Sequence, residues 1–260
     1  MDVIPQAAVT RYGSYAELPG PMLDDTVLLI ETDPGVLHGA WEVPGCYAFA
    51  SVDGYGGDPC WLNVVGSPES APLLIDTALG ELGEKCYGIT VPRGLDITKW
   101  IGRQQPNLWD AMRCDAPPTR PPGEERVAPL TDLAAVQAFL DRVNPHHSVR
   151  SDHPEVERWL GVADEASGAL LAVGAFTRRR RGTAYLASIA TAPESRGQGL
   201  GAAVTAALTR HAFTAGDETC TLAHYYPNEA AQRIYLRLGY RTTHQSQSTR
   251  FTRDRTAGCR

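Results

Sequence analysis

Residues 115–126, which read DAPPTRPPGEER, constrain the fold more than any other part of this 260-residue chain. Their prolines lack backbone N–H donors and favour extended conformations, and the glycine adds a flexible joint. Neither a helix nor a central strand is therefore expected to cross the segment. It predicts an accessory domain over residues 1–114, a proline-rich linker over 115–126 and a second domain over 127–260.

Charge differs on the two sides of this segment. Residues 1–126 carry more than twice as many Asp and Glu as Lys and Arg, whereas residues 127–260 carry more basic than acidic residues. An acidic half repels phosphates, which argues against nucleic acid as a partner. The chain has no apolar run of about 18 residues, which argues against a membrane span. Its six cysteines lie far apart with no C-x-x-C pair. This pattern, together with an N-terminus that does not resemble a secretory signal, predicts a cytoplasmic protein with reduced thiols and no metal site.

The second domain shows an α/β order of elements. Strands, bounded by turn residues, alternate with helices that have recognisable caps, such as Thr131 or Asp132 before the first helix and Gly239 after the last. In chain order the prediction is a strand (127–130), a helix (133–143), a short helix opened by Pro154 (154–159), three strands (159–163, 169–176, 183–191), a helix (199–215), a strand (220–226), a helix (229–238) and an edge strand (240–252).

The first half is less legible. Residues 46–66 predict two strands joined by a Gly-Asp turn, residues 71–82 a helix and residues 87–92 a further strand. This strand–strand–helix–strand order is like part of the second half.

A glycine-rich loop joins the strand 183–191 to the helix that follows it. Gly197, Gly199 and Gly201 let the backbone approach a ligand closely, and the first amides of the helix point outward without partners. Arg196 adds a fixed positive charge. The loop therefore favours an anion site that suits a pyrophosphate. Its spacing fits neither a Rossmann fingerprint nor a P-loop.

A second motif covers residues 228–240. Asn228 takes the N-cap position of the predicted helix, and Ala231 and Tyr235 share one face of it. The small Ala231 leaves room for a ligand, towards which Tyr235 would project its hydroxyl. Taken alone, the same pattern also fits an amphipathic helix whose tyrosine belongs to the core.

Together the two motifs resemble those of the GNAT superfamily of acyl-CoA N-acyltransferases. R-G-Q-G-L-G at 196–201 matches the family's Q/R-x-x-G-x-G/A signature. The later pattern N-x-x-A-x-x-x-Y-x-x-x-G-[FY] is matched by Asn228, Ala231, Tyr235, Gly239 and Tyr240. The resemblance covers residues 127–252. It implies an α/β (α+β) fold with a GNAT-type mixed, mostly antiparallel sheet flanked by helices, preceded by a smaller α/β accessory domain. That accessory domain resembles a degenerate copy of the same fold without the glycine loop.

The resemblance also implies a site. In such enzymes the glycine loop holds the CoA pyrophosphate, and this role maps to Arg196, Gly197, Gln198, Gly199, Leu200 and Gly201. The end of the preceding strand hydrogen-bonds the pantetheine arm, which maps to Ile189, Ala190 and Thr191. Asn228 would touch the same arm, and Tyr235 would act as general acid on the leaving thiolate.

The general base is left unassigned. Many relatives have a glutamate near the strand ends, but here the strand 183–191 has no carboxylate and Ala223 stands where some relatives have the glutamate. His224 has a suitable ordinary pKa, although a histidine on a strand is more often structural. Ser188 or Tyr225 acting through water, or an acidic residue of the first half, are the alternatives.

Two polar clusters have simpler explanations than chemistry. The arginines 178–181 fit a solvated hairpin tip better than a phosphate site. His146, His147, Asp152 and His153 match no metal motif and are weak candidates for contact with the acceptor.

The sequence thus predicts an acetyl-CoA-dependent N-acetyltransferase that acetylates the primary amine of a small molecule by direct attack. It leaves a homodimer open. Acetylation of a protein N-terminus or lysine is the enzymatic alternative. A binding protein that senses acyl-CoA without turnover is the alternative from another class, because the expected carboxylate is missing.

Overall fold

The computed structural model describes residues 9–32, 35–52, 59–179 and 182–251. Contacts divide the chain into two compact units. The first comprises residues up to Asp110, Tyr225–Pro227 and residues from His244 onwards, and the second comprises Ala111–His224 and Asn228–Thr243. The sequence prediction treats residues 127–260 as one domain, whereas these contacts assign residues from His244 onwards to the first unit. The proline-rich segment 115–126 belongs to the second unit.

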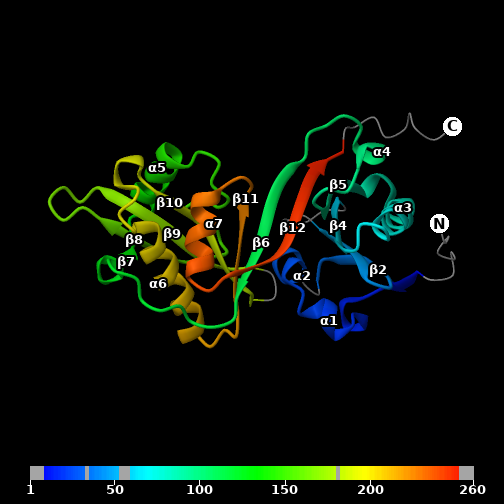
Figure 1. Ribbon diagram of the computed structural model, residues 1–260, viewed down its shortest axis with the longest axis horizontal. Helices are drawn as coiled ribbons and strands as arrows, with labels where there is room; N and C mark the ends of the chain where they lie inside the picture. Colours follow the sequence, from blue (N-terminus) through cyan, green and yellow to red (C-terminus); the bar gives the residue numbers. More distant parts are fainter. Residues whose placement is uncertain (1–8, 33–34, 53–58, 180–181, 252–260) are drawn as a thin grey trace. The chain divides into compact units, whose positions relative to one another are not determined.

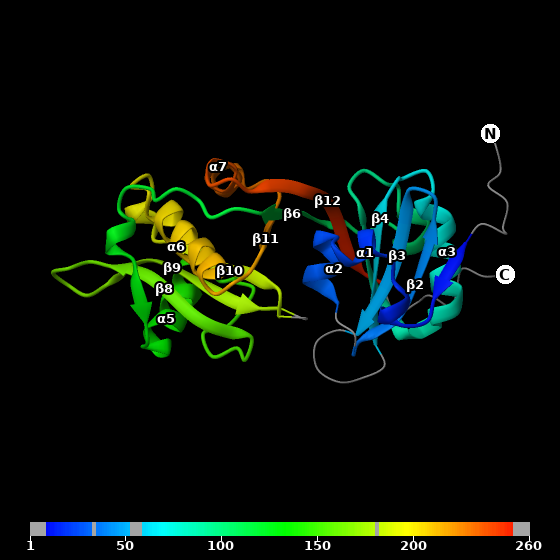
Figure 2. The same ribbon diagram turned by 90° about the horizontal axis from the view of Figure 1, so that it is seen from below.

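The first unit is a sheet with helices on both faces (Figure 2). Its strand order is β1-β2-β3-β4-β5-β12, antiparallel except for the parallel pair β4–β5, which helix α3 connects. The elements are β1 (Thr10–Tyr12), α1 (Gly20–Leu23), α2 (Thr26–Glu31), β2 (Leu37–Val43), β3 (Cys46–Val52), β4 (Cys60–Gly66), α3 (Ala71–Leu82), β5 (Cys86–Pro92) and α4 (Thr98–Ile101). Strands β6 (Asn107–Cys114) and β12 (Arg241–Arg250) contribute residues to both units.

The second unit has the strand order β12-β6-β11-β10-β9-β8-β7 (Figure 1). Neighbours β7 to β10 pair antiparallel, and β10 and β11 pair parallel. Helix α5 covers one face of this sheet and α6 the other (Figure 2). The elements are β7 (Ala128–Leu130), α5 (Leu133–Val143), β8 (Val156–Ala163), β9 (Leu170–Arg178), β10 (Ala184–Thr191), α6 (Leu200–Thr214), β11 (Cys220–Tyr225) and α7 (Glu229–Arg237).

Both units therefore confirm the predicted class, a mixed and mostly antiparallel sheet flanked by helices. Local signals place the helices well. The Asp132 carboxylate accepts from the Ala135 amide and starts α5 at the predicted residue. Gly174 on β9 lets α6 pack closely, because a Cβ there would lie 2.8 Å from Leu208 Cδ1 and 3.0 Å from Val204 Cγ1.

The short helix predicted from Pro154 is wrong. Strand β8 occupies these residues instead and pairs with β9 from Val156 onwards. Trp159 is buried on this strand, and its indole N–H donates to the Ser151 carbonyl at 3.0 Å. Pairing with a long apolar neighbour overrides the local preference of a short proline-led segment for a helical turn.

The edge position predicted for residues 240–252 is also wrong. Strand β12 lies between β5 and β6, and Ser246 to Arg250 pair antiparallel with Pro92 to Gly88. Alternation reports that a strand has one buried face, but it carries no information about which strands lie beside it.

Cys46, Cys60, Cys86, Cys114 and Cys220 are buried free thiols, whereas Cys259 lies outside the described residues. Across the described ranges no helix combines the length and apolar character that crossing a bilayer requires.

Candidate active site

Strands β10 and β11 pair only at one end, and a cavity lies at the other end of β10. Their parallel register links Tyr185 to Thr221 and Leu186 to Leu222. Beyond that point the β9–β10 register shifts between Ala187 and Ala190. Ser188 lies inside this bulge and has a φ of 49°. Among the described residues it is the non-glycine residue whose φ is positive. The bulge changes the direction of the end of β10.

The resulting cavity measures about 750 Å³ and lies within the second unit. This volume is in the range of cavities that hold a cofactor or drug-sized ligand. The predicted site residues that line it are Ile189, Ala190, Thr191, Arg196, Gly197, Gly199, Leu200, Gly201, Asn228 and Tyr235. Gln198 is exposed and is not part of the lining.

The sequence analysis missed four other parts of the lining. They are Thr119 and Pro121 of the proline-rich segment, and Val143 and Asn144 at the end of α5. The prolines indicated a linker, and nothing in their pattern reveals that the linker forms a wall. The cavity lining contains no aspartate or glutamate.

The glycine loop has the conformation that an anion site requires. Gly197 and Gly199 have φ values of +78° and +79°, and α6 begins directly afterwards at Leu200. The first helical hydrogen bond runs from the Ala203 amide to the Gly199 carbonyl at 3.0 Å. The preceding amides of the first turn have no acceptor in the helix and carry its positive dipole end. Within the described residues no carboxylate pairs with Arg196, so its charge adds to theirs.

The loop also packs closely against the end of β10. A Cβ at Gly201 would lie 3.1 Å from Thr191 Oγ1, tighter than ordinary contact. A side chain there would push the first turn of α6 away from the strand. The glycine thus keeps the strand end and the helix start in one site.

Helix α7 forms the opposite wall. Its N-cap is Asn228, whose side-chain oxygen accepts from the Ala231 amide at 3.2 Å. The cap occupies this oxygen, and Asn228 lines the cavity.

Tyr235 is 7% exposed and lies 5.8 Å from His224 and 6.0 Å from Tyr240, measured between ring centroids. Burial raises the pKa of the Tyr235 hydroxyl well above its ordinary value. At neutral pH the group therefore remains a proton donor.

Tyr235 and Tyr240 differ in how their hydroxyls are used. The Tyr240 hydroxyl lies 2.8 Å from Thr209 Oγ1 and 3.3 Å from Cys220 Sγ in the core. The Tyr235 hydroxyl has no hydrogen-bond partner among the residues that the structure describes, and its side chain lines the cavity. Of these two tyrosines, only Tyr235 is placed to contact a ligand in the cavity.

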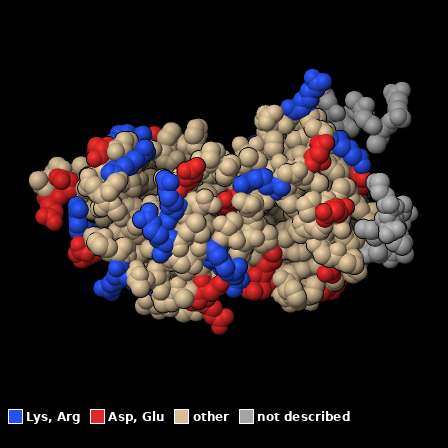
Figure 3. Space-filling view, viewed as in Figure 1, with Lys and Arg blue, Asp and Glu red and all other residues tan. Residues whose placement is uncertain are grey.

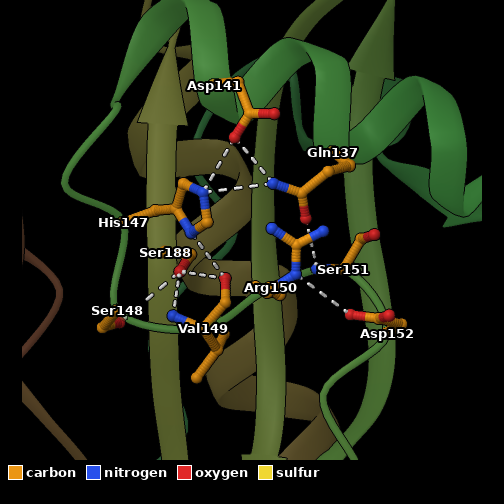
Figure 4. Close-up of polar contacts among 9 residues, drawn as sticks. All are labelled: Gln137, Asp141, His147, Ser148, Val149, Arg150, Ser151, Asp152 and Ser188. Carbon is orange, nitrogen blue, oxygen red and sulfur yellow. Dashed lines mark hydrogen bonds and ion pairs between the residues drawn. The ribbon is translucent and has the colours of Figure 1, made fainter.

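Ser188 holds a loop instead of facing a reactant (Figure 4). Its hydroxyl accepts from the Val149 amide at 3.1 Å and donates to the Val149 carbonyl at 3.2 Å. Because its proton is committed to this carbonyl, the structure does not favour Ser188 as a proton relay. His224 is buried on β11 and remains a candidate base, and no base is assigned.

The polar cluster after α5 is a structural network (Figure 4). His147 Nδ1 lies 2.9 Å from the Val149 carbonyl, and Nε2 lies 3.2 Å from Asp141 Oδ1. The Asp141 oxygen also accepts from the Gln137 amide at 2.7 Å. These hydrogen bonds, that of His147 first, lower the pKa of Asp141. The cluster fastens the loop to α5, and no group of three or more metal-binding side chains occurs in the described ranges.

Two of the four arginines at 178–181 are neutralised locally. Arg178 forms ion pairs with Asp217 and Glu157, and Arg179 pairs with Glu155 at 3.3 Å. These pairs favour the solvated-hairpin interpretation over a phosphate site. Arg180 and Arg181 lie outside the described residues.

Comparisons with known proteins agree with this geometry. Residues 117–240 match the model of the Acetyltransferase (GNAT) family. The fold is similar to that of a GCN5-related N-acetyltransferase from Sphaerobacter thermophilus, with a TM-score of 0.55 and 15% identity over 84% of this chain and 82% of that one. It is also similar to a GCN5-related N-acetyltransferase from Kribbella flavida, with a TM-score of 0.52 and 17% identity over 83% and 90%. A GNAT-family acetyltransferase from Colwellia psychrerythraea gives a TM-score of 0.51 and 18% identity over 92% of both chains.

Proposed function

Because residues 117–240 match the model of the Acetyltransferase (GNAT) family, we propose that the protein moves an acetyl group from acetyl-CoA to the primary amine of a small molecule. One observation carries the proposal. A single cavity brings together an unpaired helix N-terminus with its glycine loop, the bent end of β10 and the buried hydroxyl of Tyr235.

The donor fits this cavity in its chemistry. Its pyrophosphate is an anion, and the amides at the start of α6 together with Arg196 are the matching donors. The backbone of Ile189, Ala190 and Thr191 lies where β10 has separated from β11, so that strand-type hydrogen bonds are open to the amide groups of a pantetheine arm. The NH₂ group of Asn228 would contact the same arm.

The reaction forms one bond and breaks another. The amine nitrogen attacks the thioester carbonyl carbon, and the C–S bond breaks as the amide bond forms. The departing sulfur takes the proton of the Tyr235 hydroxyl, and the proton of the attacking amine leaves to a base that is not assigned. Holding both reactants in one cavity contributes much of the acceleration.

We place the reaction in the cytoplasm, in keeping with the free thiols, and expect the acceptor to be a small molecule. Acetylation of a protein N-terminus or lysine is the enzymatic alternative. The absence of a carboxylate from the cavity lining favours a second candidate, a sensor that binds acyl-CoA without turnover. Sustained release of CoA with any amine would exclude the sensor.

The test combines calorimetry with turnover on a panel of primary amines. We expect acetyl-CoA to bind with a Kd near the micromolar range, about −8 kcal/mol. Replacement of Tyr235 by Phe should leave this affinity unchanged and lower kcat by about 100-fold or more, because the general acid is lost. The matched control, Tyr240→Phe, removes a core hydroxyl and should lower stability with kcat retained. Unchanged turnover in Tyr235→Phe would refute the general-acid role, and no binding of acetyl-CoA would refute the proposal.

A further inference from the structure

A chain of hydrogen bonds connects His147, in the loop after α5, to the bulge of β10. The Val149 carbonyl accepts from His147 Nδ1 at 2.9 Å and from the Ser188 hydroxyl at 3.2 Å (Figure 4). The Val149 amide donates back to Ser188 Oγ at 3.1 Å. Val149 is buried, so water competes little for these contacts. His147 and Ser188 thus hold the same backbone segment from two sides.

Ser188 is the point at which this chain of hydrogen bonds reaches the cavity. Its φ of 49° lies in the left-handed region, which is unfavourable for a residue with a side chain. The surroundings therefore have to hold it there, and its two hydrogen bonds to Val149 contribute to this. Ile189, Ala190 and Thr191 follow directly and line the cavity. A change at Ser188 would consequently turn the strand end that lines the cavity.

The other ring nitrogen of His147 faces a donor and an acceptor at equal distance. Nε2 lies 3.2 Å from Gln137 Nε2 and 3.2 Å from Asp141 Oδ1. The Gln137 amide is oriented by its own partners, because its oxygen accepts from the Ser151 amide at 2.9 Å and its nitrogen donates to Asp141 at 2.7 Å. A neutral ring accepts at Nε2 from Gln137, and a charged ring donates there to Asp141. Nδ1 carries a proton in both states.

The charges around the ring permit both states. The hydrogen bond of His147 first, and then that of Gln137, lower the pKa of Asp141, so that it is a carboxylate near neutral pH. The charge of Arg150 acts in the same direction, and Arg150 pairs with Asp152 at 3.5 Å.

Charges on the open surface matter less to this ring. Figure 3 shows acidic and basic side chains next to one another on the exposed face of the second unit, where water and salt screen them. The His147 side chain is only 9% exposed. Its direct hydrogen-bond partners therefore decide which nitrogen carries the proton.

We propose that His147 is a positioning residue for the cavity. In both of its charge states it donates from Nδ1 to the Val149 carbonyl, which holds Ser188 in the bulge and sets the direction of residues 189–191. His147 does not belong to the cavity lining and acts through Val149 and Ser188. Its effect on acetyl-CoA rests on the proposed function, whereas the hydrogen bonds themselves do not.

Two substitutions separate the two sides of the ring. The side-chain nitrogen of asparagine takes the place of Nδ1, and that of glutamine takes the place of Nε2. His147→Asn should therefore keep the donor to Val149, and His147→Gln should lose it. Each variant gives up one side of the ring, so thermal unfolding should be affected similarly in the two.

Hydrogen exchange of the Val149 amide, followed by NMR, measures the contact with Ser188. We expect exchange to be about tenfold faster in His147→Gln and within about twofold of the wild type in His147→Asn. His146→Gln is the matched control, because His146 is the exposed neighbour, and its exchange should equal that of the wild type. Unchanged exchange in His147→Gln would overturn the proposal.

Nitrogen chemical shifts of the His147 ring test the two charge states. The neutral ring should be the Nδ1–H tautomer, so that Nδ1 keeps its proton from about pH 5 to pH 8. Loss of the Nδ1 proton as the pH rises would contradict the assignment of this nitrogen as a permanent donor. A merely structural histidine would not require one tautomer.

Calorimetry with acetyl-CoA tests the link to the cavity. Affinity should fall by about fivefold to tenfold in His147→Gln and stay within about twofold of the wild type in His147→Asn and His146→Gln. Faster exchange with unchanged affinity in His147→Gln would refute the positioning role. If the wild type does not bind acetyl-CoA, the proposed function and the effect on its ligand both fail, while the exchange rates still decide whether His147 anchors Val149.

Discussion

The crossover β4–α3–β5 of the first unit and the crossover β10–α6–β11 of the second have the same topology but different interiors. In both, a helix connects two parallel strands next to an antiparallel neighbour. In the first, the β3–β4 register runs unbroken from Cys46 with Gly66 to Val52 with Cys60. In the second, the bulge at Ser188 breaks the equivalent register and the parallel strands separate. The parallel pair of the first crossover has a register shift of its own, between Cys60 and Trp61, but stays paired as far as Asn63 with Thr90.

The segments that lead into the two crossover helices, α3 and α6, also differ. Between β4 and α3 lie only residues 67–70, and the Glu69 carboxylate there accepts from the Ser67 hydroxyl. Between β10 and α6 lie residues 192–199, with left-handed glycines and Arg196. A carboxylate at a helix start repels phosphate, whereas a guanidinium attracts it. Topology alone does not make a nucleotide site; loop length, backbone conformation and charge do.

Placing a negative charge at the start of α6 should have the largest effect of the three changes, because it should abolish the difference in anion binding between the two helix starts. In Gly199→Glu we expect acetyl-CoA affinity to fall by about 1,000-fold, or about 4 kcal/mol, because a carboxylate replaces open space beside the amides. Gly102→Glu is the matched control, since Gly102 is also exposed with a positive φ, +67°, and nothing lies within 4 Å of an added Cβ. Both variants should lose about 1–2 kcal/mol of stability from backbone strain. Isothermal calorimetry measures the affinity, and equal binding by the two variants would contradict the loop assignment.

Opening the first crossover should affect stability and not binding. The Trp61 ring on β4 lies against Gly88 on β5, where an added Cβ would be 2.2 Å from the ring. The Trp61 indole N–H donates to Thr90 Oγ1 at 2.8 Å. For Trp61→Ala we expect unfolding in urea to require about 3 kcal/mol less. The affinity and the stoichiometry of acetyl-CoA should not change. A second bound equivalent in this variant would show that the indole masks a site, contrary to our view of the first unit.

Relaxing the bulge should have the smallest effect of the three. Ser188→Ala removes both hydrogen bonds to Val149, and we expect a loss of about 1–2 kcal/mol in the free energy of unfolding. Ser148→Ala serves as the control. Ser148 is exposed, and its hydroxyl makes only a long contact, 3.4 Å, with the Ser188 hydroxyl. Similar stability of the two variants would mean that the bulge does not depend on this anchor.

The sequence predicts the elements whose signals are local. Helix α5 with its Asp132 cap and helix α3 at 71–82 both have the predicted bounds. The glycine loop and the Asn228–Tyr235 face were placed in one site by the resemblance of both motifs to those of the GNAT superfamily.

What the sequence could not predict depends on long-range pairing. Strand β8 replaced the helix expected at Pro154 because β9 offers it a partner. The wall at Thr119 and Pro121 depends on Arg210, which is far away in the chain and anchors the segment through a carbonyl. Arg210 also forms an ion pair with Glu124, and nothing in the sequence indicates that these distant residues are partners. The resemblance of the first unit to a degenerate copy stays a prediction.

The sharing of β12 between the units has a consequence for synthesis on the ribosome. Strand β5 pairs with β12 through Gly88 to Pro92, yet Ser246 to Arg250 are translated about 150 residues later. During that interval the nascent first unit exposes an unpaired strand edge, a feature prone to intermolecular association. A chain that ends before Ser246 would therefore contain the second unit but lack the residues of β12 that pair with β5 in the first.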